Sequence, residues 1–287
     1  MHLLAATPGA IADGAEAVDL GQSPGDIVVL SAADTELATL TRVRGERGES
    51  GPSLRLANLM QLSHDLSVDL YVDAVVTAAR LVVVRLLGGV GYWPYGVEQL
   101  VETCRRRGIP LALLPGDDNP DPELARLSSL PPEACHRLWQ YCVQGGLENA
   151  RHFLGYAGSL IGGDGDWAEP VPVPRAGLYW PGLARPALDD LRAEWVAGAP
   201  VAAVVFYRAL LQAGNLAPVD GLVAALAGCG VNPLPIFAAS LKEPVAAESV
   251  AGLLAAAPPA VILNATGFAV SSPGAERKKG PVDGPCL

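Results

Sequence analysis

The stretch Arg80–Gly96, RLVVVRLLGGVGYWPYG, joins an apolar run typical of a buried strand to a glycine-rich turn with a Tyr-Trp-Pro triplet. A second copy of the triplet ends the shorter run Arg175–Gly182, RAGLYWPG. Aromatic residues make up only 6% of the chain, so two Tyr-Trp pairs placed after strand-like runs are informative. Because ligands of open α/β sheets bind at the carboxyl ends of strands, these pairs are candidates for contact with a large planar ligand or a partner surface. The structural alternative is that both pairs anchor half-buried turns.

The residues on either side of the first stretch alternate between strand-like and helix-like segments. The expected strands of this half are Leu3–Ala6, Asp26–Ser31, Ser53–Ala57, Leu81–Leu87 and Pro110–Leu114. The expected helices are Asp34–Val43, Val68–Ala79, Tyr95–Arg107, Pro132–Gln144 and Glu148–Leu160. Short strands separated by helices of this length predict right-handed βαβ crossovers and a parallel sheet.

The same alternation restarts around the second triplet. The expected strands here are Ala176–Tyr179, Val201–Phe206, Leu234–Phe237 and Ala260–Asn264. The expected helices are Ala187–Ala197, Pro218–Ala227 and Ala246–Ala256. The pattern therefore predicts an α/β protein with two doubly wound, flavodoxin-like parallel-sheet units.

The composition along the chain suggests where these units begin and end. Residues 1–161 form the first unit with its helical tail, and residues 175–270 form the second. Between them, residues 162–174 are rich in glycine and then in proline, which is typical of a linker. Residues 271–287 are polar, carry a basic cluster and are expected to diverge and be disordered, as after a truncation or frameshift. The charged loop Arg44–Pro52 is expected to be mobile.

The overall charge and hydropathy narrow the class of partner. With 30 acidic and 20 basic residues the formal net charge is −10, which argues against nucleic acid or an anionic membrane surface. The charge-free stretch Ser249–Ala275 is interrupted by Pro258, Pro259 and Gly267, so we expect no membrane span. No secretory signal is recognisable at the amino end, and a cytoplasmic location is expected. The five cysteines contain no C-x-x-C pair and are expected to be reduced structural thiols.

The common catalytic and cofactor motifs do not occur. No lysine is followed by Ser or Thr, so a phosphate-binding loop is missing and the chain is not expected to hydrolyse ATP. The match to a nucleophile elbow at Gly21–Gly25 precedes a strand rather than a helix, which argues against a hydrolase. The four histidines show no metal-ligand spacing. We therefore assign no catalytic residue, no metal ligand and no cofactor bound by this chain.

Two polar features lie close to predicted strand ends. The acidic loop Asp117–Asp121 could hold Mg²⁺ through water, but helix capping is the favoured interpretation. Arg208, after Tyr207 and the strand Val201–Phe206, could pair with a ligand carboxylate or bond a backbone carbonyl. The candidate substrate-binding residues are Tyr92, Trp93, Tyr179, Trp180, Tyr207 and Arg208.

Eight segments carry a resemblance to a known family: SLRLANL, LSVDLYV, ARLVVVRLLGGVGYWPYGVEQL, LALLPGDD, ENARHFL, RAGLYWPG, VVFYRALLQAGNLAPVD and NATGFAVSSPG. Together they resemble the amino-terminal region of CobN, the large subunit of aerobic cobaltochelatase, which is related to the H subunit of magnesium chelatase. The likeness runs from Met1 to about Gly274.

The resemblance implies ATP-dependent insertion of Co²⁺ into hydrogenobyrinic acid a,c-diamide during cobalamin biosynthesis. In that family the large subunit carries the corrinoid, while an AAA+ ATPase subunit and its adaptor subunit hydrolyse ATP with Mg²⁺. Family members are several times longer than this chain, so we expect a truncated portion that is inactive alone. The alternatives are a magnesium chelatase H-type subunit, a stand-alone tetrapyrrole-binding module and a subunit-docking module.

Overall fold

The computed structural model describes residues 16–48 and 51–267. The chain divides into two compact units, Met1–Pro172 and Val173–Leu287. The expected strand Leu3–Ala6 and the tail 271–287 lie outside the described residues.

A four-stranded parallel sheet, sheet A, forms the centre of the first unit. Its strands are β1 (Ile27–Ser31), β2 (Leu54–Asn58), β3 (Leu81–Leu86) and β4 (Leu111–Pro115). Their order is β2-β1-β3-β4, so the chain passes from β1 to β2 on one side and then returns past β1 to β3. This reversal places a topological switch point between β1 and β3, the usual ligand position of doubly wound sheets.

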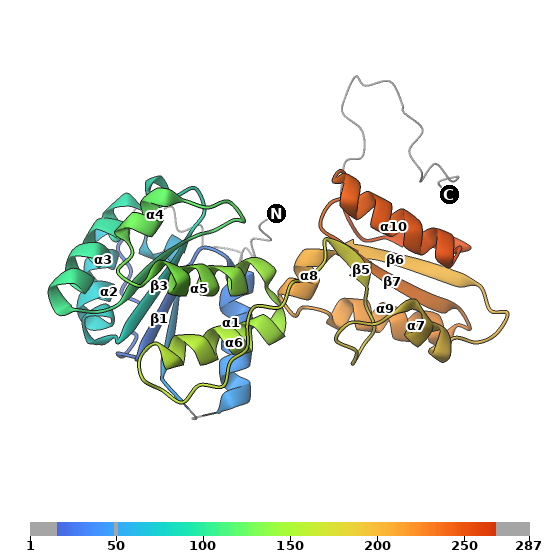
Figure 1. The fold of residues 1–287 in the computed structure, drawn as a ribbon, viewed down its shortest axis with the longest axis horizontal. Helices are drawn as coiled ribbons and strands as arrows, with labels where there is room; N and C mark the ends of the chain where they lie inside the picture. The colour runs from blue at the N-terminus through green and yellow to red at the C-terminus, as the bar shows by residue number, and fades with distance from the viewer. Residues whose placement is uncertain (1–15, 49–50, 268–287) are drawn as a thin grey trace, which may run out of the picture. The chain divides into compact units, whose positions relative to one another are not determined.

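Helices cover both faces of sheet A, because its apolar strands expose side chains alternately to each face (Figure 1). One face packs against α2 (Asp65–Ala74), α3 (Pro94–Arg107) and the short α4 (Pro122–Leu127). The other packs against α1 (Asp34–Arg47), α5 (Pro132–Gln144) and α6 (Gly146–Ser159). The described residues of this unit also form three 3-10 turns: η1 (Leu59–Leu62), η2 (Val76–Ala78) and η3 (Val90–Tyr92).

The second unit contains sheet B with the order β5-β7-β6-β8. The strands are β5 (Ala176–Leu178), β6 (Val201–Tyr207), β7 (Asn232–Ala238) and β8 (Val261–Asn264). The helices are α7 (Leu188–Glu194), α8 (Arg208–Gln212), α9 (Ala217–Gly228) and α10 (Pro244–Ala256). The strands β6, β7 and β8 are parallel, as expected, and their order repeats the first three strands of sheet A.

Strand β5 departs from the expected parallel arrangement. It pairs antiparallel with β7, with Ala176 opposite Ala238 and Leu178 opposite Ile236. No crossover helix leads into this three-residue edge strand, so nothing in the connectivity forces a parallel direction. The chain after β5 therefore runs toward the amino ends of β6 and β7, away from their carboxyl edge.

Two segments expected to be irregular are partly ordered. Helix α1 continues to Arg47, whose guanidinium donates to the Arg151 carbonyl at 2.9 Å, so the expected loop Arg44–Pro52 begins later. In the expected linker, the Val171 N–H donates to Asn149 Oδ1 at 2.8 Å and its carbonyl accepts from Asn149 Nδ2 at 2.9 Å. Trp167 also packs against the core around α5 and α6. Residues up to Val171 are therefore held on the first unit.

Candidate functional site

The carboxyl edge of sheet A contains a buried charge at the switch point. Ser31 and Arg85 are register partners at the ends of β1 and β3. The Arg85 guanidinium is buried, forms an ion pair with Glu36 in the first turn of α1, and donates from Nε to the Pro115 carbonyl at 3.1 Å. The Ser31 hydroxyl donates to the second carboxylate oxygen of Glu36 at 2.8 Å. The arginine at this switch point is thus paired with the chain's own carboxylate.

The electrostatics of this cluster follow from its partial exclusion of water. Burial raises the pKa of Glu36, while the Arg85 cation and the Ser31 hydrogen bond act in the opposite direction. Burial also raises the pKa of the nearby Cys142 thiol to about 12, so this thiol is protonated at neutral pH and is a poor nucleophile. The cluster is therefore a structural ion pair, and no reactive group is generated by it.

Tyr92 is the accessible member of the first Tyr-Trp pair. It lies in η3 after β3, is 41% exposed, and donates its hydroxyl proton to Met60 Sδ at 3.4 Å. Met60 lies in η1 after β2 and is 52% exposed. Because β2 and β3 flank β1, this contact bridges the loops on either side of that strand. We call these two residues the Met60–Tyr92 pair; they form an exposed apolar surface at the carboxyl edge of sheet A.

Trp93 is a core residue. Its ring is buried, its indole N–H donates to the Leu62 carbonyl at 2.7 Å, and its ring lies against the backbone of Gly96. A Cβ atom at Gly96 would lie 2.0 Å from the ring atom Cε2. The turn-anchor interpretation therefore describes Trp93, whereas Tyr92 remains available for contact.

The side chains of the second Tyr-Trp pair also make most of their contacts inside the fold. Tyr179 is buried, donates its hydroxyl proton to Asp220 Oδ1 at 2.5 Å, and lies edge-on to Phe206 at 5.9 Å between ring centroids. Burial and the Asp220 carboxylate raise the pKa of the Tyr179 hydroxyl. Trp180 is partly buried and packs against the cores on both faces of sheet B. Since β5 is antiparallel, the pair follows the strand in the direction away from the expected carboxyl edge.

Tyr207 and Arg208 do lie at the carboxyl end of β6. The Tyr207 hydroxyl oxygen accepts from the Gly267 N–H at 2.6 Å. Arg208 donates from Nε to the Pro174 carbonyl and from Nη2 to the Val173 carbonyl, both at 2.9 Å. These bonds match the carbonyl-binding alternative for Arg208 and fix the start of the second unit.

The chain therefore distributes the six candidates over two sheets. Tyr92 and Trp93 belong to the first unit, and the other four belong to the second. Of the first pair, Tyr92 combines exposure with a position at the carboxyl edge of parallel strands. The sequence did not predict the contact of Tyr92 with Met60, because nothing in the local pattern distinguishes this methionine from a core residue. It also missed Arg85, although an arginine within the apolar run LVVVRL was a usable signal.

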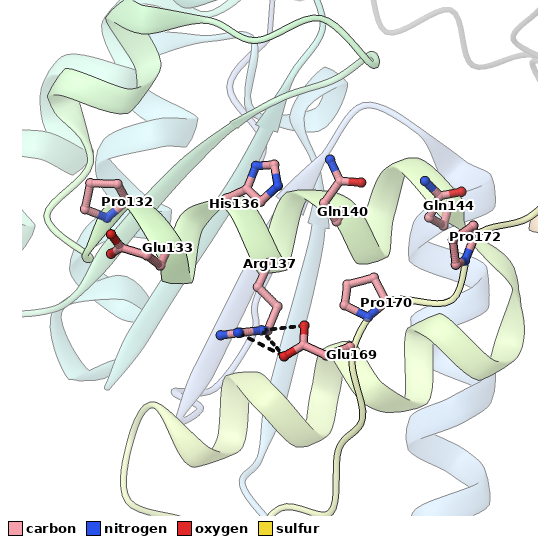
Figure 2. Close-up of a pocket in the computed structure, with 9 residues that line it drawn as sticks. All are labelled: Pro132, Glu133, His136, Arg137, Gln140, Gln144, Glu169, Pro170 and Pro172. Atoms are coloured by element: carbon pink, nitrogen blue, oxygen red, sulfur yellow. Dashed lines mark hydrogen bonds and ion pairs between the residues drawn. The ribbon is translucent and has the colours of Figure 1, made fainter.

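A groove of about 560 Å³ lies on the outer side of α5 (Figure 2). It is lined by Pro132, Glu133, His136, Arg137, Gln140, Gln144, Glu169, Pro170 and Pro172. In Figure 2, the Arg137 guanidinium points at the Glu169 carboxylate, with Nε 3.0 and 3.1 Å from its two oxygens. The guanidinium also stacks at 4.9 Å from the ring centre of Tyr156 and 5.1 Å from that of Trp167. Arg137 therefore holds the segment around Glu169 on α5.

The remaining polar candidates also have internal roles. Asp121 is the N-cap of α4 and accepts from the Glu123 and Leu124 N–H groups, which confirms helix capping at this residue. His64 Nδ1 accepts from the Leu66 N–H at 3.1 Å, and His152 Nδ1 accepts from the Ala168 N–H at 3.1 Å. Within residues 16–48 and 51–267, no three His, Cys, Asp or Glu side chains are grouped as metal ligands.

In the described part of the chain, none of the helices has both the length and the apolar character to span a bilayer. Cys104, Cys135, Cys142 and Cys229 are free thiols, and Cys286 lies outside the described residues. Burial raises the pKa of Cys104 to about 12, which keeps this thiol protonated.

Comparison with known proteins gives a consistent family assignment. A family model described as CobN/Magnesium Chelatase matches residues 139–283, and so continues into the segment 271–287 that was expected to diverge. The chain is 44% identical over 286 residues to the aerobic cobaltochelatase subunit CobN of a Sinorhizobium species, and 46% identical over 274 residues to that of Pseudomonas aeruginosa. These alignments cover 97% and 95% of the chain but 22% of either relative. The chain thus spans about a fifth of the length of these relatives.

A solved structure agrees with the sequence comparison. The catalytic subunit of cobaltochelatase from Mycobacterium tuberculosis superposes with a TM-score of 0.58 and 29% sequence identity. The match covers 79% of this chain and 17% of that chain. The α/β architecture described above is therefore shared with a portion of a much longer protein.

Proposed function

Because this chain belongs to the CobN and magnesium chelatase family, we propose that it is the amino-terminal portion of the corrinoid-binding large subunit of an aerobic cobaltochelatase. The observation that carries this proposal is the 44% and 46% identity to two CobN subunits across nearly the whole chain. A magnesium chelatase H-type subunit remains the alternative within the family, and the names of these relatives favour cobalt.

The proposed reaction is the insertion of Co²⁺ into hydrogenobyrinic acid a,c-diamide during cobalamin biosynthesis. An AAA+ ATPase subunit and its adaptor subunit would hydrolyse ATP with Mg²⁺ in the cytoplasm. This division of labour is consistent with a sequence in which no lysine precedes Ser or Thr. Since the chain spans 22% of the CobN relatives, we propose that metal insertion requires the remainder of the subunit and that this portion is inactive alone.

Within this scheme the Met60–Tyr92 pair is the proposed contact for the corrinoid. A corrin ring offers an apolar face surrounded by amide and carboxylate groups. An exposed aromatic ring beside a polarisable thioether suits such a face. Polar groups lie close by, since Asn58 ends β2 and its side-chain amide donates to Asp34 Oδ1 at 2.5 Å. The proposed role is substrate positioning.

A segment exchange tests the proposed function. The part of the Pseudomonas aeruginosa subunit that aligns with this chain would be replaced by this chain, and cobalt insertion would be measured with the motor subunits, ATP and corrinoid. We expect the chimera to insert cobalt, because the exchanged segment is 46% identical. A chimera that melts like the parent subunit but inserts no cobalt would contradict the proposal.

Two control experiments are needed to interpret the segment exchange. A parent subunit that lacks the segment should be inactive; retained activity would show that the segment is dispensable and would overturn its proposed role. The chimera should also be assayed with Mg²⁺ and protoporphyrin. Magnesium insertion without cobalt insertion would favour the H-type alternative.

A further inference from the structure

We infer that the free edge of β8 in sheet B receives a further parallel strand and a covering helix from the part of the large subunit that lies outside this chain. This inference rests on the proposed function, because it assumes a subunit of CobN length. All four residues of β8 are exposed. Three of them are apolar: Val261 is 48% exposed, Ile262 39% and Leu263 38%.

The exposure of β8 is unusual for its position in the sheet. The order β7-β6-β8 in sheet B repeats the order β2-β1-β3 in sheet A, with parallel pairing throughout. The counterpart of β8 is therefore β3, and all six residues of β3 are buried. In sheet A, β4 pairs with the far edge of β3, and the helix that follows β3, α3, packs on one face. The first unit thus shows what normally covers the third strand of this arrangement.

Within residues 173–267, the part of the second unit that the structure describes, the helices do not provide that cover. Helix α10 contacts β5 and β7, and α9 contacts β7 on the other face, so both helices lie over the half of sheet B that is remote from β8. Among the described residues no strand pairs with the outer edge of β8, and an exposed apolar edge strand is a site for strand addition. Cover for β8 would consist of a further strand at its edge and a helix over one face of the sheet.

The surfaces of α9 and α10 support the same conclusion. Each contains a single charged residue, Asp220 in α9 and Glu248 in α10. In contrast, α3 of the first unit carries two glutamates and three arginines on a helix of 14 residues. A solvated helix face normally carries charges. The uncharged exposed faces of α9 and α10 are therefore consistent with further contact to protein.

The length of the relatives indicates which polypeptide covers β8. The chain covers 22% of two CobN subunits, so a CobN-length subunit has ample polypeptide to continue the sheet. A parallel strand after β8 needs a crossover helix, which supplies the strand and the cover together. A second copy of this chain would pair its β8 edge by two-fold symmetry and would leave the faces without helices. Continuation of the sheet provides both a strand at the edge and a helix over one face.

Amide hydrogen exchange tests this inference directly. Two proteins would be compared: the 287-residue chain, and the same chain followed by the region that comes after the aligned segment in the Pseudomonas aeruginosa subunit. We expect the amides of Val261–Asn264 to exchange at least about ten-fold more slowly in the longer protein, since the strand gains a neighbour. The matched control is β2, the edge strand of sheet A, whose exchange should be the same in both proteins.

A substitution gives an independent readout. Ile262→Asn should leave the melting temperature of the 287-residue chain nearly unchanged and should lower that of the longer protein by several degrees. Leu66→Asn on α2 of the first unit, where the side chain is 50% exposed, is the control and should be tolerated in both.

Two outcomes would overturn the inference. One is unchanged exchange of β8 in a longer protein that melts cooperatively. The other is protection of β8 in the 287-residue chain that rises with concentration together with a dimeric mass, which would make a second copy the occupant. Neither outcome depends on corrinoid binding or cobalt insertion, so failure here is distinguishable from failure of the proposed function.

Discussion

Arg85 on β3 and Glu36 in the first turn of α1 form a largely buried ion pair, although 49 residues separate them in the chain. The pair lies at the switch point of sheet A, with Ser31 of β1 bonded to the same carboxylate. It ties the end of β3 to the start of α1 at the switch point, where doubly wound sheets commonly bind ligands.

Removal of either partner of this pair should destabilise the first unit. Arg85→Leu leaves the Glu36 carboxylate partly buried without its cation, and we expect a loss of about 3 kcal/mol in the free energy of unfolding. Glu36→Leu should cost a similar amount, and the double variant should recover part of it. The measurement is urea unfolding of all three variants.

The exposed pair Arg42–Glu46 on α1 is the control for these three variants. Because both side chains are solvated, Arg42→Leu should cost less than about 1 kcal/mol. Equal costs at the two sites would show that the Arg85 pair has no special role.

The contact between Gly96 and Trp93 gives a second prediction. A Cβ at Gly96 would lie 2.0 Å from the buried ring, so Gly96→Ala should displace the indole and cost about 1–3 kcal/mol. Gly91 in η3 has no atom within 4 Å of its would-be Cβ, and Gly91→Ala should be nearly neutral. Thermal unfolding followed by tryptophan fluorescence compares the two variants; equal melting temperatures would refute the packing argument.

The strands and most helices of both units could be predicted from the sequence, because β-branched runs and helical apolar spacing are local signals. Helix α5, for example, was predicted with its exact bounds, Pro132–Gln144. The direction of β5 could not be predicted, since three apolar residues carry no information about the partner strand. Strand direction is decided by pairing with β7, which follows more than 50 residues later.

The candidate site was only partly predictable for a related reason. The two Tyr-Trp pairs were visible as motifs, but whether a ring enters the core depends on its surroundings in the fold. Trp93 is buried because Gly96 leaves space for its ring, while the adjacent Tyr92 points to the surface and meets Met60. Arg208 illustrates the same limit: its carbonyl partners Val173 and Pro174 precede it by more than 30 residues.

Tyr92 should affect ligand binding without affecting stability. Tyr92→Ala in the full chain should change the melting temperature by no more than a few degrees, because the side chain is 41% exposed. If the Met60–Tyr92 pair contacts the corrinoid, its dissociation constant should rise by about ten-fold, and Tyr92→Phe should restore most of the affinity. Isothermal titration with the corrinoid measures this; unchanged affinity in both variants would exclude Tyr92 from the binding surface.

Arg208 should act on the fold of the second unit and not on the corrinoid. Arg208→Met removes the hydrogen bonds to the Val173 and Pro174 carbonyls, and we expect a loss of about 1–2 kcal/mol and faster proteolysis at the start of this unit. Arg208→Lys should retain part of the stability. Corrinoid affinity that falls in Arg208→Met while stability is unchanged would instead support a carboxylate-binding role.

Asp26 gives a prediction about acid stability. Its carboxylate accepts hydrogen bonds from the Ser53 N–H at 2.8 Å and the Ser53 hydroxyl at 2.6 Å, and Arg80 lies 3.6 Å away. These contacts, led by the Ser53 hydroxyl, lower the pKa of Asp26 in the folded chain. The folded state therefore binds its proton less readily than the unfolded state, in which the pKa is about 3.9. The stabilisation is present above that pH and is lost as the pH falls through the lower, folded value.

The expected measurement is the free energy of unfolding from pH 7 to pH 2 for the natural chain and for Asp26→Asn. The variant should be less stable at pH 7, and the difference should shrink as the pH falls below about 4, because the unfolded natural chain then takes up a proton that the folded carboxylate binds only at its lower pKa. Asp189, which pairs with Arg192 on the exposed face of α7, is the control, and Asp189→Asn should show little difference at either pH. A constant difference between the natural chain and Asp26→Asn over the whole range would mean that the hydrogen bonds of Asp26 stabilise the fold independently of its charge.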